Sequence, residues 1–200
     1  MRKIDPKASA LLIIDMQNDV LHPKGGWAAA GSPMHAKLKG TVPHIKAIAE
    51  KARRKRMPVI HILHVMTKGA KDAAQNAPLF KNLAKTGNNR QGTWGAEPFA
   101  ALKPKPGDYI VTKQRVSGFM GTDLENKLKG LGVRRLIVTG GWTNFAVEGT
   151  CRDGVDLGFE ITVVEDATCT MNEAWHRASL DHALTQLGEI ASTEAVLKAF

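Results

Sequence analysis

The sequence predicts an α/β protein: a three-layer, doubly wound sheet of six parallel strands with helices on both faces. Continuous apolar runs recur along the chain, and each is typical of a strand that is covered on both faces. Segments with apolar residues at three- and four-residue spacing lie between these runs and indicate helices. Because strand and helix alternate, the sheet is expected to be parallel.

Five apolar runs are the predicted strands, and charged residues mark the ends of two of them. The first run ends at Asp15, and Lys113 directly follows the third. A sixth, shorter strand is expected near Gly188. The five runs cover residues 9–15, 58–64, 109–112, 136–139 and 161–164.

Four helices are predicted between the strands, over residues 42–56, 123–131, 144–157 and 173–187. Two other connections, residues 16–40 and 65–105, are too long and irregular to be simple turns. Long loops in compact domains are usually functional or disordered. We expect both connections to form walls of a pocket.

Length and composition predict one domain over residues 1–200, because 200 residues with 43% hydrophobic content can bury a single core. No apolar run approaches the roughly 20 residues of a spanning helix, and no hydrophobic signal region precedes the first strand. We therefore expect a cytoplasmic protein without membrane contact. Two cysteines, Cys151 and Cys169, fit a reducing compartment.

The net charge of +9 at pH 7 raises the possibility of a nucleic-acid partner. The densest basic run, residues 51–56, closes a predicted helix, where cations favour the negative end of the macrodipole. No aromatic residues lie among these charges to stack on bases. We interpret the run as a solvated helix terminus and expect no nucleic-acid partner.

Three features are expected to converge at the carboxyl ends of the strands, where doubly wound sheets bind ligands. Asp15 ends the first strand, Lys113 follows the third, and residues 142–146 follow the fourth and open a helix. Each alone has an ordinary structural explanation. Together they bring an acid, a cation and a helix N-terminus to one volume.

These features lie in three motifs that closely resemble those of the isochorismatase-like cysteine hydrolases. The motifs are DMQND from Asp15, KQRVSGF from Lys113 and TNFAVEGTCRDG from Thr143, and the similarity runs from about Ala10 to the end of the chain. The resemblance implies a six-stranded parallel sheet, a homo-oligomer (dimer or tetramer), no cofactor, and a catalytic Asp, Lys and Cys. The aspartate falls on Asp15 and the lysine on Lys113, but the cysteine position holds Ala146.

Each member of such an Asp, Lys and Cys set has a defined chemical role. An ammonium and a helix N-terminus lower the pKa of a thiol from about 8.5, and a carboxylate accepts its proton and later delivers it to a leaving amine. The resemblance implies an oxyanion hole from the N–H groups of Trp142 and Ala146, and a cis peptide at Gly141-Trp142. Cys151 lies five residues beyond Ala146 and so faces about 140° away at roughly 100° per residue. We predict that it is a packed structural thiol.

Three hypotheses account for Ala146. In the first, which we favour, the parent is an amide or ureide hydrolase and the alanine is an engineered replacement that inactivates it, because Asn144 and Glu148 keep the amidase pattern. The second is an isochorismatase-type vinyl ether hydrolase that uses Asp15 as general acid and needs no thiol. The third is a natural non-catalytic binding protein of the same fold.

No metal is predicted. Nicotinamidase-like relatives bind a metal through an Asp-x-His arrangement after the second strand, but this chain has His61 and His64 there. Three residues apart on a strand, they point to opposite faces.

The substrate is expected to be a small amide or ureide, since the motifs near Trp94, Lys113 and Val164 look most like those of ureidoacrylate, biuret and carbamoyl-compound hydrolases. Aromatic walls would exclude water and select a small planar amide. The residues expected to contact substrate are Asn18, Val20, Trp27, Trp94, Phe119 and Phe145.

Overall fold

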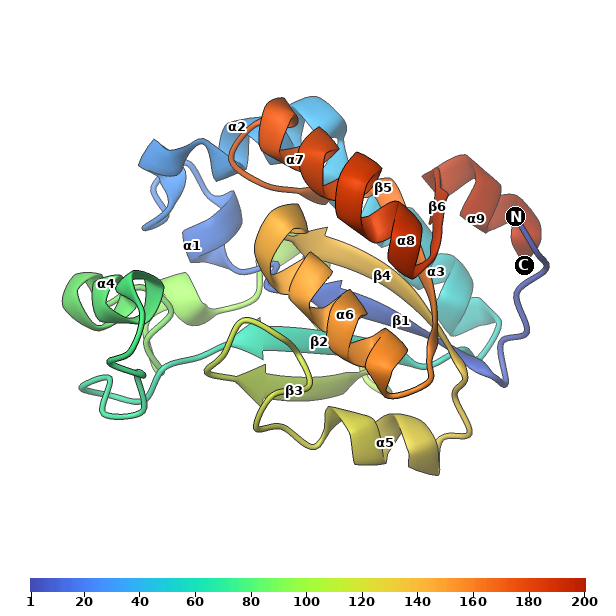
Figure 1. Ribbon diagram of the computed structural model, residues 1–200, viewed down its shortest axis with the longest axis horizontal. Helices are drawn as coiled ribbons and strands as arrows, with labels where there is room; N and C mark the ends of the chain where they lie inside the picture. The colour runs from blue at the N-terminus through green and yellow to red at the C-terminus, as the bar shows by residue number, and fades with distance from the viewer.

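Six parallel strands form one sheet in the order β3-β2-β1-β4-β5-β6, in a computed structural model that describes residues 1–200 (Figure 1). The order reverses between β1 and β4, so the predicted doubly wound topology is confirmed. The strands are β1 (Ser9–Ile14), β2 (Val59–His64), β3 (Tyr109–Lys113), β4 (Arg135–Gly141), β5 (Glu160–Cys169) and β6 (Glu189–Ala191).

Two hydrophobic clusters, one on each face of the sheet, make the core. The five apolar residues of β1 alternate between them, so that Leu11 and Ile13 join one cluster while Ala10, Leu12 and Ile14 join the other. The first cluster is completed mainly by α2 (Ser32–Lys39), α3 (Thr41–Arg54) and α9 (Thr193–Ala199). The second is completed mainly by α5 (Leu124–Gly130), α6 (Glu148–Asp156) and the π-helical segment Leu180–Leu184.

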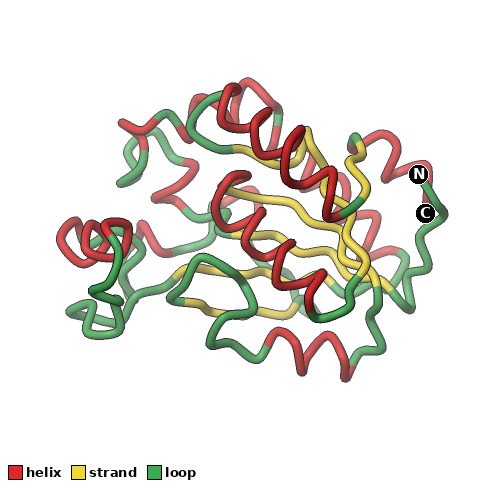
Figure 2. The backbone as a smooth tube through the Cα atoms, in the orientation of Figure 1, coloured by secondary structure: helices red, strands yellow, loops and turns green.

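The remaining helices sit around these layers. Figure 2 shows helical segments on both sides of the strands and the two chain ends side by side, where the Ile4 N–H donates to the Ala199 carbonyl (2.8 Å). No helix is long and apolar enough to cross a membrane. The other helical segments are α1 (Asn18–Leu21), α4 (Pro78–Thr86), π-helical Thr143–Val147, α7 (Glu173–Ser179), α8 (Thr185–Leu187) and short 3₁₀ turns at Ala28–Ala30, Trp94–Ala96 and Ala100–Leu102.

The predicted elements differ from the structure in three places. The predicted strand 161–164 extends to Cys169, because pairing with β4 resumes beyond an irregularity, at Gly140 opposite Thr168. The predicted helix 173–187 contains a π-helical segment between α7 and α8. The long connections contain α2 and α4, and α2 gave no helical signal because apolar residues such as Leu38 face solvent.

Candidate active site

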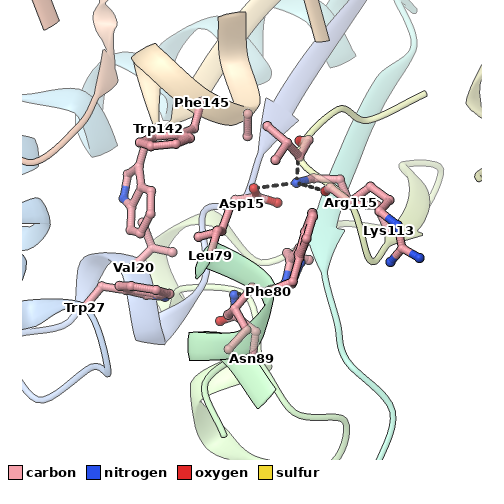
Figure 3. Close-up of a pocket in the computed structure, with 15 residues that line it drawn as sticks. Asp15, Val20, Trp27, Leu79, Phe80, Asn89, Lys113, Arg115, Trp142 and Phe145 are labelled. Carbon is pink, nitrogen blue, oxygen red and sulfur yellow. Dashed lines mark hydrogen bonds and ion pairs between the residues drawn. The ribbon is translucent and has the colours of Figure 1, made fainter. Parts of the chain in front are cut away.

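A pocket opens at the carboxyl ends of β1, β3 and β4, beside the reversal of strand order. Asp15, Lys113 and Ala146 all line it, so the three features that the sequence predicted to converge do meet there. This is the position at which doubly wound sheets bind ligands. Figure 3 shows Asp15 and Lys113 in contact in the middle of the view, with Trp142 and Phe145 on one side and Asn89 on the other.

Asp15 and Lys113 form a buried ion pair. Asp15 directly follows β1 and adopts a left-handed backbone conformation (φ 52°), while Lys113 is the last residue of β3 and is 1% exposed. The Lys113 Nζ donates to Asp15 Oδ2 (2.8 Å) and to the carbonyls of Arg115 (3.1 Å) and Val116 (3.0 Å). All three ammonium protons therefore have acceptors, and the lysine is held in one orientation.

Burial and Lys113 act on the pKa of Asp15 in opposite directions. Burial raises the pKa of Asp15 above its ordinary value, against the charge and the hydrogen bond of Lys113, which lower it. Asp15 Oδ1 is buried without a hydrogen-bond partner and remains an available acceptor.

The loop after β4 turns sharply into helix. The peptide bond between Gly141 and Trp142 is cis, as the resemblance implied. Gly140 has a φ of 114°, and a Cβ there would lie 2.2 Å from the Ile14 carbonyl oxygen, so only glycine fits. The Trp142 backbone N–H donates to no acceptor within the protein. Trp142 and Ala146 both line the pocket, and a ligand there can use this free donor.

Hydrogen bonds tie the π-helical turn Thr143–Val147 to the lysine motif. The Gly118 N–H donates to the Thr150 hydroxyl (2.9 Å), which donates to the Ala146 carbonyl (2.6 Å). Thr150 thus links the segment after Lys113 to the turn that carries Ala146.

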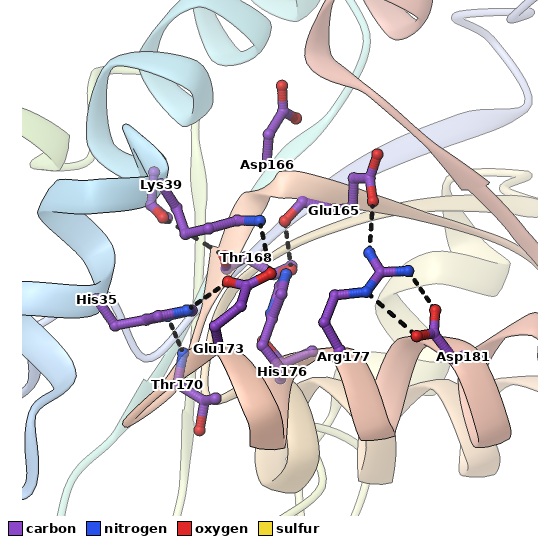
Figure 4. A network of polar contacts seen from close by, with 12 residues as sticks. His35, Lys39, Glu165, Asp166, Thr168, Thr170, Glu173, His176, Arg177 and Asp181 are labelled. Carbon is purple, nitrogen blue, oxygen red and sulfur yellow. Dashed lines mark hydrogen bonds and ion pairs between the residues drawn. The ribbon is translucent and has the colours of Figure 1, made fainter.

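A second set of contacts ties the same turn to α7. Thr143 Oγ1 lies 2.8 Å from His176 Nδ1. Burial lowers the pKa of His176 to about 4, so this contact involves a neutral imidazole at neutral pH. Figure 4 shows His176 beside Glu173, which accepts a hydrogen bond from His35 Nε2 (3.0 Å).

Apolar side chains from three segments wall the pocket. Val20 and Trp27 come from the first long connection, and Trp27 packs edge-to-face on Trp142 (4.8 Å between ring centroids). Phe145 comes from the π-helical turn. The second long connection contributes α4, through Leu79, Phe80 and Leu83. Both connections therefore are pocket walls, as predicted.

Three residues expected to contact substrate do not line the pocket. Asn18 is buried and its Nδ2 donates to the Trp94 carbonyl (2.8 Å), which makes it a loop tether. Trp94 is half exposed and packs edge-to-face on His22. Phe119 stacks on Phe159 at 5.8 Å and packs against the core. The structure therefore places these three residues outside the pocket lining.

Sequence reasoning missed three polar residues of the pocket: His64, Asn89 and Arg115. His64 had a usable signal, because it ends β2 beside Lys113 in the strand register. Asn89 lies in the irregular part of the second connection and gave no signal.

The two strand histidines face opposite ways, as expected. His61 Nε2 lies 3.1 Å from Asp108 Oδ2, on the side of the sheet away from the pocket, whereas His64 lines the pocket. No three His, Cys, Asp or Glu side chains lie where they could hold a metal ion together. The prediction that the site uses no metal stays a prediction.

The two cysteines are free and buried. Cys151 belongs to the core cluster beneath α6, and burial strongly raises the pKa of its thiol. It does not line the pocket. The structure therefore agrees with the prediction that Cys151 is a packed structural thiol.

Comparisons with known proteins agree with this geometry. The chain is 34% identical to the ureidoacrylate amidohydrolase RutB of Caulobacter vibrioides, over 95% of this chain and 90% of that protein. A cysteine hydrolase from Pseudomonas syringae pv. phaseolicola has a similar structure (TM-score 0.88, 26% identity, 100% of this chain and 95% of that chain). An isochorismatase family protein from Desulfovibrio vulgaris is also similar (TM-score 0.83, 29% identity, 94% and 96%). The Isochorismatase domain matches residues 9–195, and the chain therefore belongs to the isochorismatase family.

Proposed function

We propose that this chain is an amidohydrolase of a small ureide, carbamoyl compound or carboxamide in which Ala146 stands at the position of the nucleophilic cysteine. With alanine at position 146, the chain would bind its substrate and cleave it negligibly. The observation that carries the proposal is the buried Asp15–Lys113 pair facing a pocket that Ala146 also lines. The relative RutB, named as a ureidoacrylate amidohydrolase, supports the reaction class.

With a thiol at position 146, each group has a role in acyl transfer. Asp15 accepts the thiol proton on Oδ1, which has no other partner, and the thiolate attacks the amide carbonyl. The N–H groups of Trp142 and residue 146 stabilise the oxyanion, and Asp15 delivers its proton to the departing nitrogen. Water then hydrolyses the thioester. A raised pKa suits Asp15 to this work, because a group that moves a proton both ways functions best when its pKa is near the working pH.

Ala146 removes the nucleophile but leaves the other groups unchanged. Its methyl group carries no acid or base, while the free Trp142 N–H and the Asp15–Lys113 contact depend on the backbone and on other strands. Neither cysteine replaces the missing thiol, since both are buried in the core clusters. The chain should therefore hold an intact amide.

The test is Ala146→Cys. We expect this variant to release ammonia from at least one compound in a panel of biuret, ureidoacrylate, N-carbamoyl compounds and nicotinamide, while the unmodified chain releases none measurable above background. The matched control is Ala146→Ser in the same assay, because a serine hydroxyl is not activated to an anion under these conditions and should give far less turnover. A folded Ala146→Cys protein that is inactive on the whole panel would favour the non-catalytic binding protein instead.

A second candidate function is vinyl ether hydrolysis with Asp15 as general acid. The raised pKa of Asp15 favours it, because a protonated carboxyl is what that reaction needs. Rapid hydrolysis of isochorismate by the unmodified chain would establish this function in place of the first.

We further propose that the protein acts in the cytoplasm as a homo-oligomer. Its two free, buried cysteines suit a reducing compartment. Light scattering at micromolar concentration measures the assembly directly, and a monomer would contradict this part of the proposal.

A further inference from the structure

The pocket has a second polar end, formed by Asn89 and His64. Asn89 lies beyond α4, is 4% exposed and lines the pocket. Its Nδ2 lies 3.5 Å from His64 Nδ1, and its Oδ1 is buried with no hydrogen-bond partner. Figure 3 shows Asn89 and Phe145 at opposite ends of the pocket, with Asp15 between them. A buried acceptor without a partner is costly, so it marks a place where a ligand donor fits.

Backbone geometry alone does not account for this asparagine. Asn89 has a φ of 55°, a conformation that asparagine tolerates well. However, Ala70 in the same connection has a φ of 52°, so other residues adopt this conformation here. The Asn89 N–H donates to Asp19 Oδ2 (2.7 Å) and its carbonyl accepts from the Met66 N–H (2.9 Å). The backbone is thus fixed independently, and the side-chain amide is left for the pocket.

His64 brings no positive charge to this end of the pocket. Burial, and then the charge of Lys113, lower the pKa of His64 to about 3, so the imidazole is neutral at physiological pH. A neutral ring can accept the Asn89 amide proton on Nδ1. The Asn89 oxygen is then left without a donor in the protein.

Lys113 is fully engaged by the protein, and Arg115 is held to one side of the pocket by Nη1 and by the Phe80 ring. All three protons of the Lys113 ammonium have acceptors in the protein. Arg115 places its guanidinium over the Phe80 ring (5.5 Å) and donates to the carbonyls of Asp72 and Gln114. In Figure 3 this guanidinium lies on the far side of Phe80 from Trp27. A carboxylate placed at the Asn89 end of the pocket would meet the unpartnered Asn89 oxygen and a neutral His64.

We propose that the ligand is a neutral ureide with N–H donors at both ends, and that Asn89 accepts a hydrogen bond from the end remote from Ala146. The two unpartnered acceptors of the pocket, Asp15 Oδ1 and Asn89 Oδ1, then each receive one donor. This inference rests on the proposed function and deepens it, because it separates a neutral diamide from the carboxylate-bearing ureidoacrylate.

The test compares biuret with acetylurea on the unmodified chain, by calorimetry. Acetylurea replaces one terminal NH₂ of biuret by CH₃, so the two probes match in size and differ in that donor. We expect biuret to bind about 10-fold more tightly, since one satisfied hydrogen bond to a buried acceptor is of that order. Ureidoacrylate, which carries a carboxylate, should bind more weakly than biuret.

Three variants assign the preference to the side chain. Asn89→Gly keeps the left-handed backbone, removes the amide and should reduce the biuret preference to less than about 2-fold. Asn89→Asp keeps an acceptor and should keep the preference. Ala70→Gly is the matched control, because it changes a residue with similar φ that does not line the pocket, and it should behave as the unmodified chain.

The outcomes separate this inference from the proposed function. Equal affinities for biuret and acetylurea, or an unchanged preference in folded Asn89→Gly, would overturn the role of Asn89 alone. Tighter binding of ureidoacrylate than of biuret would overturn the neutral-ligand class. If no ureide binds at all, both the inference and the proposed function are wrong.

Discussion

Replacing Lys113 by methionine tests the pair on which the site is built. Methionine has a similar length but has neither the charge nor the three donors that reach Asp15, Arg115 and Val116. Lys113 is 1% exposed and Asp15 is 8% exposed, so water does not replace the lost partner. Removing one member of a buried ion pair typically costs about 3–5 kcal/mol, because the other charge is left uncompensated. We expect Lys113→Met to lower the free energy of unfolding by that amount at pH 7.

The loss should depend on pH, with a definite sign. Burial already raises the pKa of Asp15, and loss of the lysine raises it further. A carboxyl whose pKa is raised in the folded state stabilises the fold most at low pH. Its contribution to the free energy of unfolding is full below the unfolded-state pKa and is lost as the pH rises through the folded-state pKa. The difference between variant and unmodified protein should therefore shrink on acidification. In the pH range between the Asp15 pKa values of the two proteins, the difference in their free energies of unfolding shrinks by up to about 1.4 kcal/mol per pH unit.

Urea unfolding followed by tryptophan fluorescence at pH 7 and pH 5 measures both quantities. Lys113→Arg is the charge-preserving control, although its planar donors fit the site less well. A loss below about 1 kcal/mol at pH 7, or an equal loss at both pH values, would refute the reasoning that an uncompensated Asp15 carboxylate causes the effect.

Two further predictions concern packing around the site. Cys151 should react slowly with iodoacetamide at neutral pH in the folded protein and rapidly in urea, because burial raises the pKa of its thiol; fast labelling of the folded chain would contradict its assignment as a core residue. Gly140→Ala should prevent the accumulation of folded protein, since the added Cβ would lie 2.2 Å from the Ile14 carbonyl oxygen. The control Gly130→Ala adds a Cβ in open space and should fold normally. Expression level and circular dichroism measure both variants.

The sequence predicted the fold and the centre of the site because both follow from regular structure. Parallel strands bring their carboxyl ends to one edge of the sheet, so Asp15 after β1 and Lys113 at the end of β3 were expected at the same edge. The helix that opens after β4 brought Ala146 to the same edge by the same rule.

Side-chain direction in irregular segments could not be predicted in this way. Phe119 lies only six residues beyond Lys113, yet it turns to stack on Phe159 in the core. Trp94 follows a glycine-containing loop and faces solvent beside His22. Arg90, which directly follows Asn89, forms an isolated β-bridge with Met66, and this contact brings Asn89 to the pocket. No periodic pattern in the sequence indicates such a contact. Strand patterns placed the first residues of β1–β5 to within one residue, whereas loops need tertiary contacts to fix their course.

The Asp15–Lys113 pair is an inefficient way to stabilise this fold, and that favours a role in binding. Taking two charges out of water costs several kcal/mol per ion, and well-packed apolar replacements are often neutral or stabilising. The double variant Asp15→Asn with Lys113→Met should therefore recover much of the stability that Lys113→Met alone loses, because no charge remains buried. Asparagine also tolerates the left-handed backbone of residue 15 (φ 52°). The same double variant should lose ureide binding, since it removes the carboxylate charge on the acceptor Oδ1 and the Lys113 contact that orients the group. A protein that regains stability and still binds biuret normally would show that ureide binding does not depend on the pair.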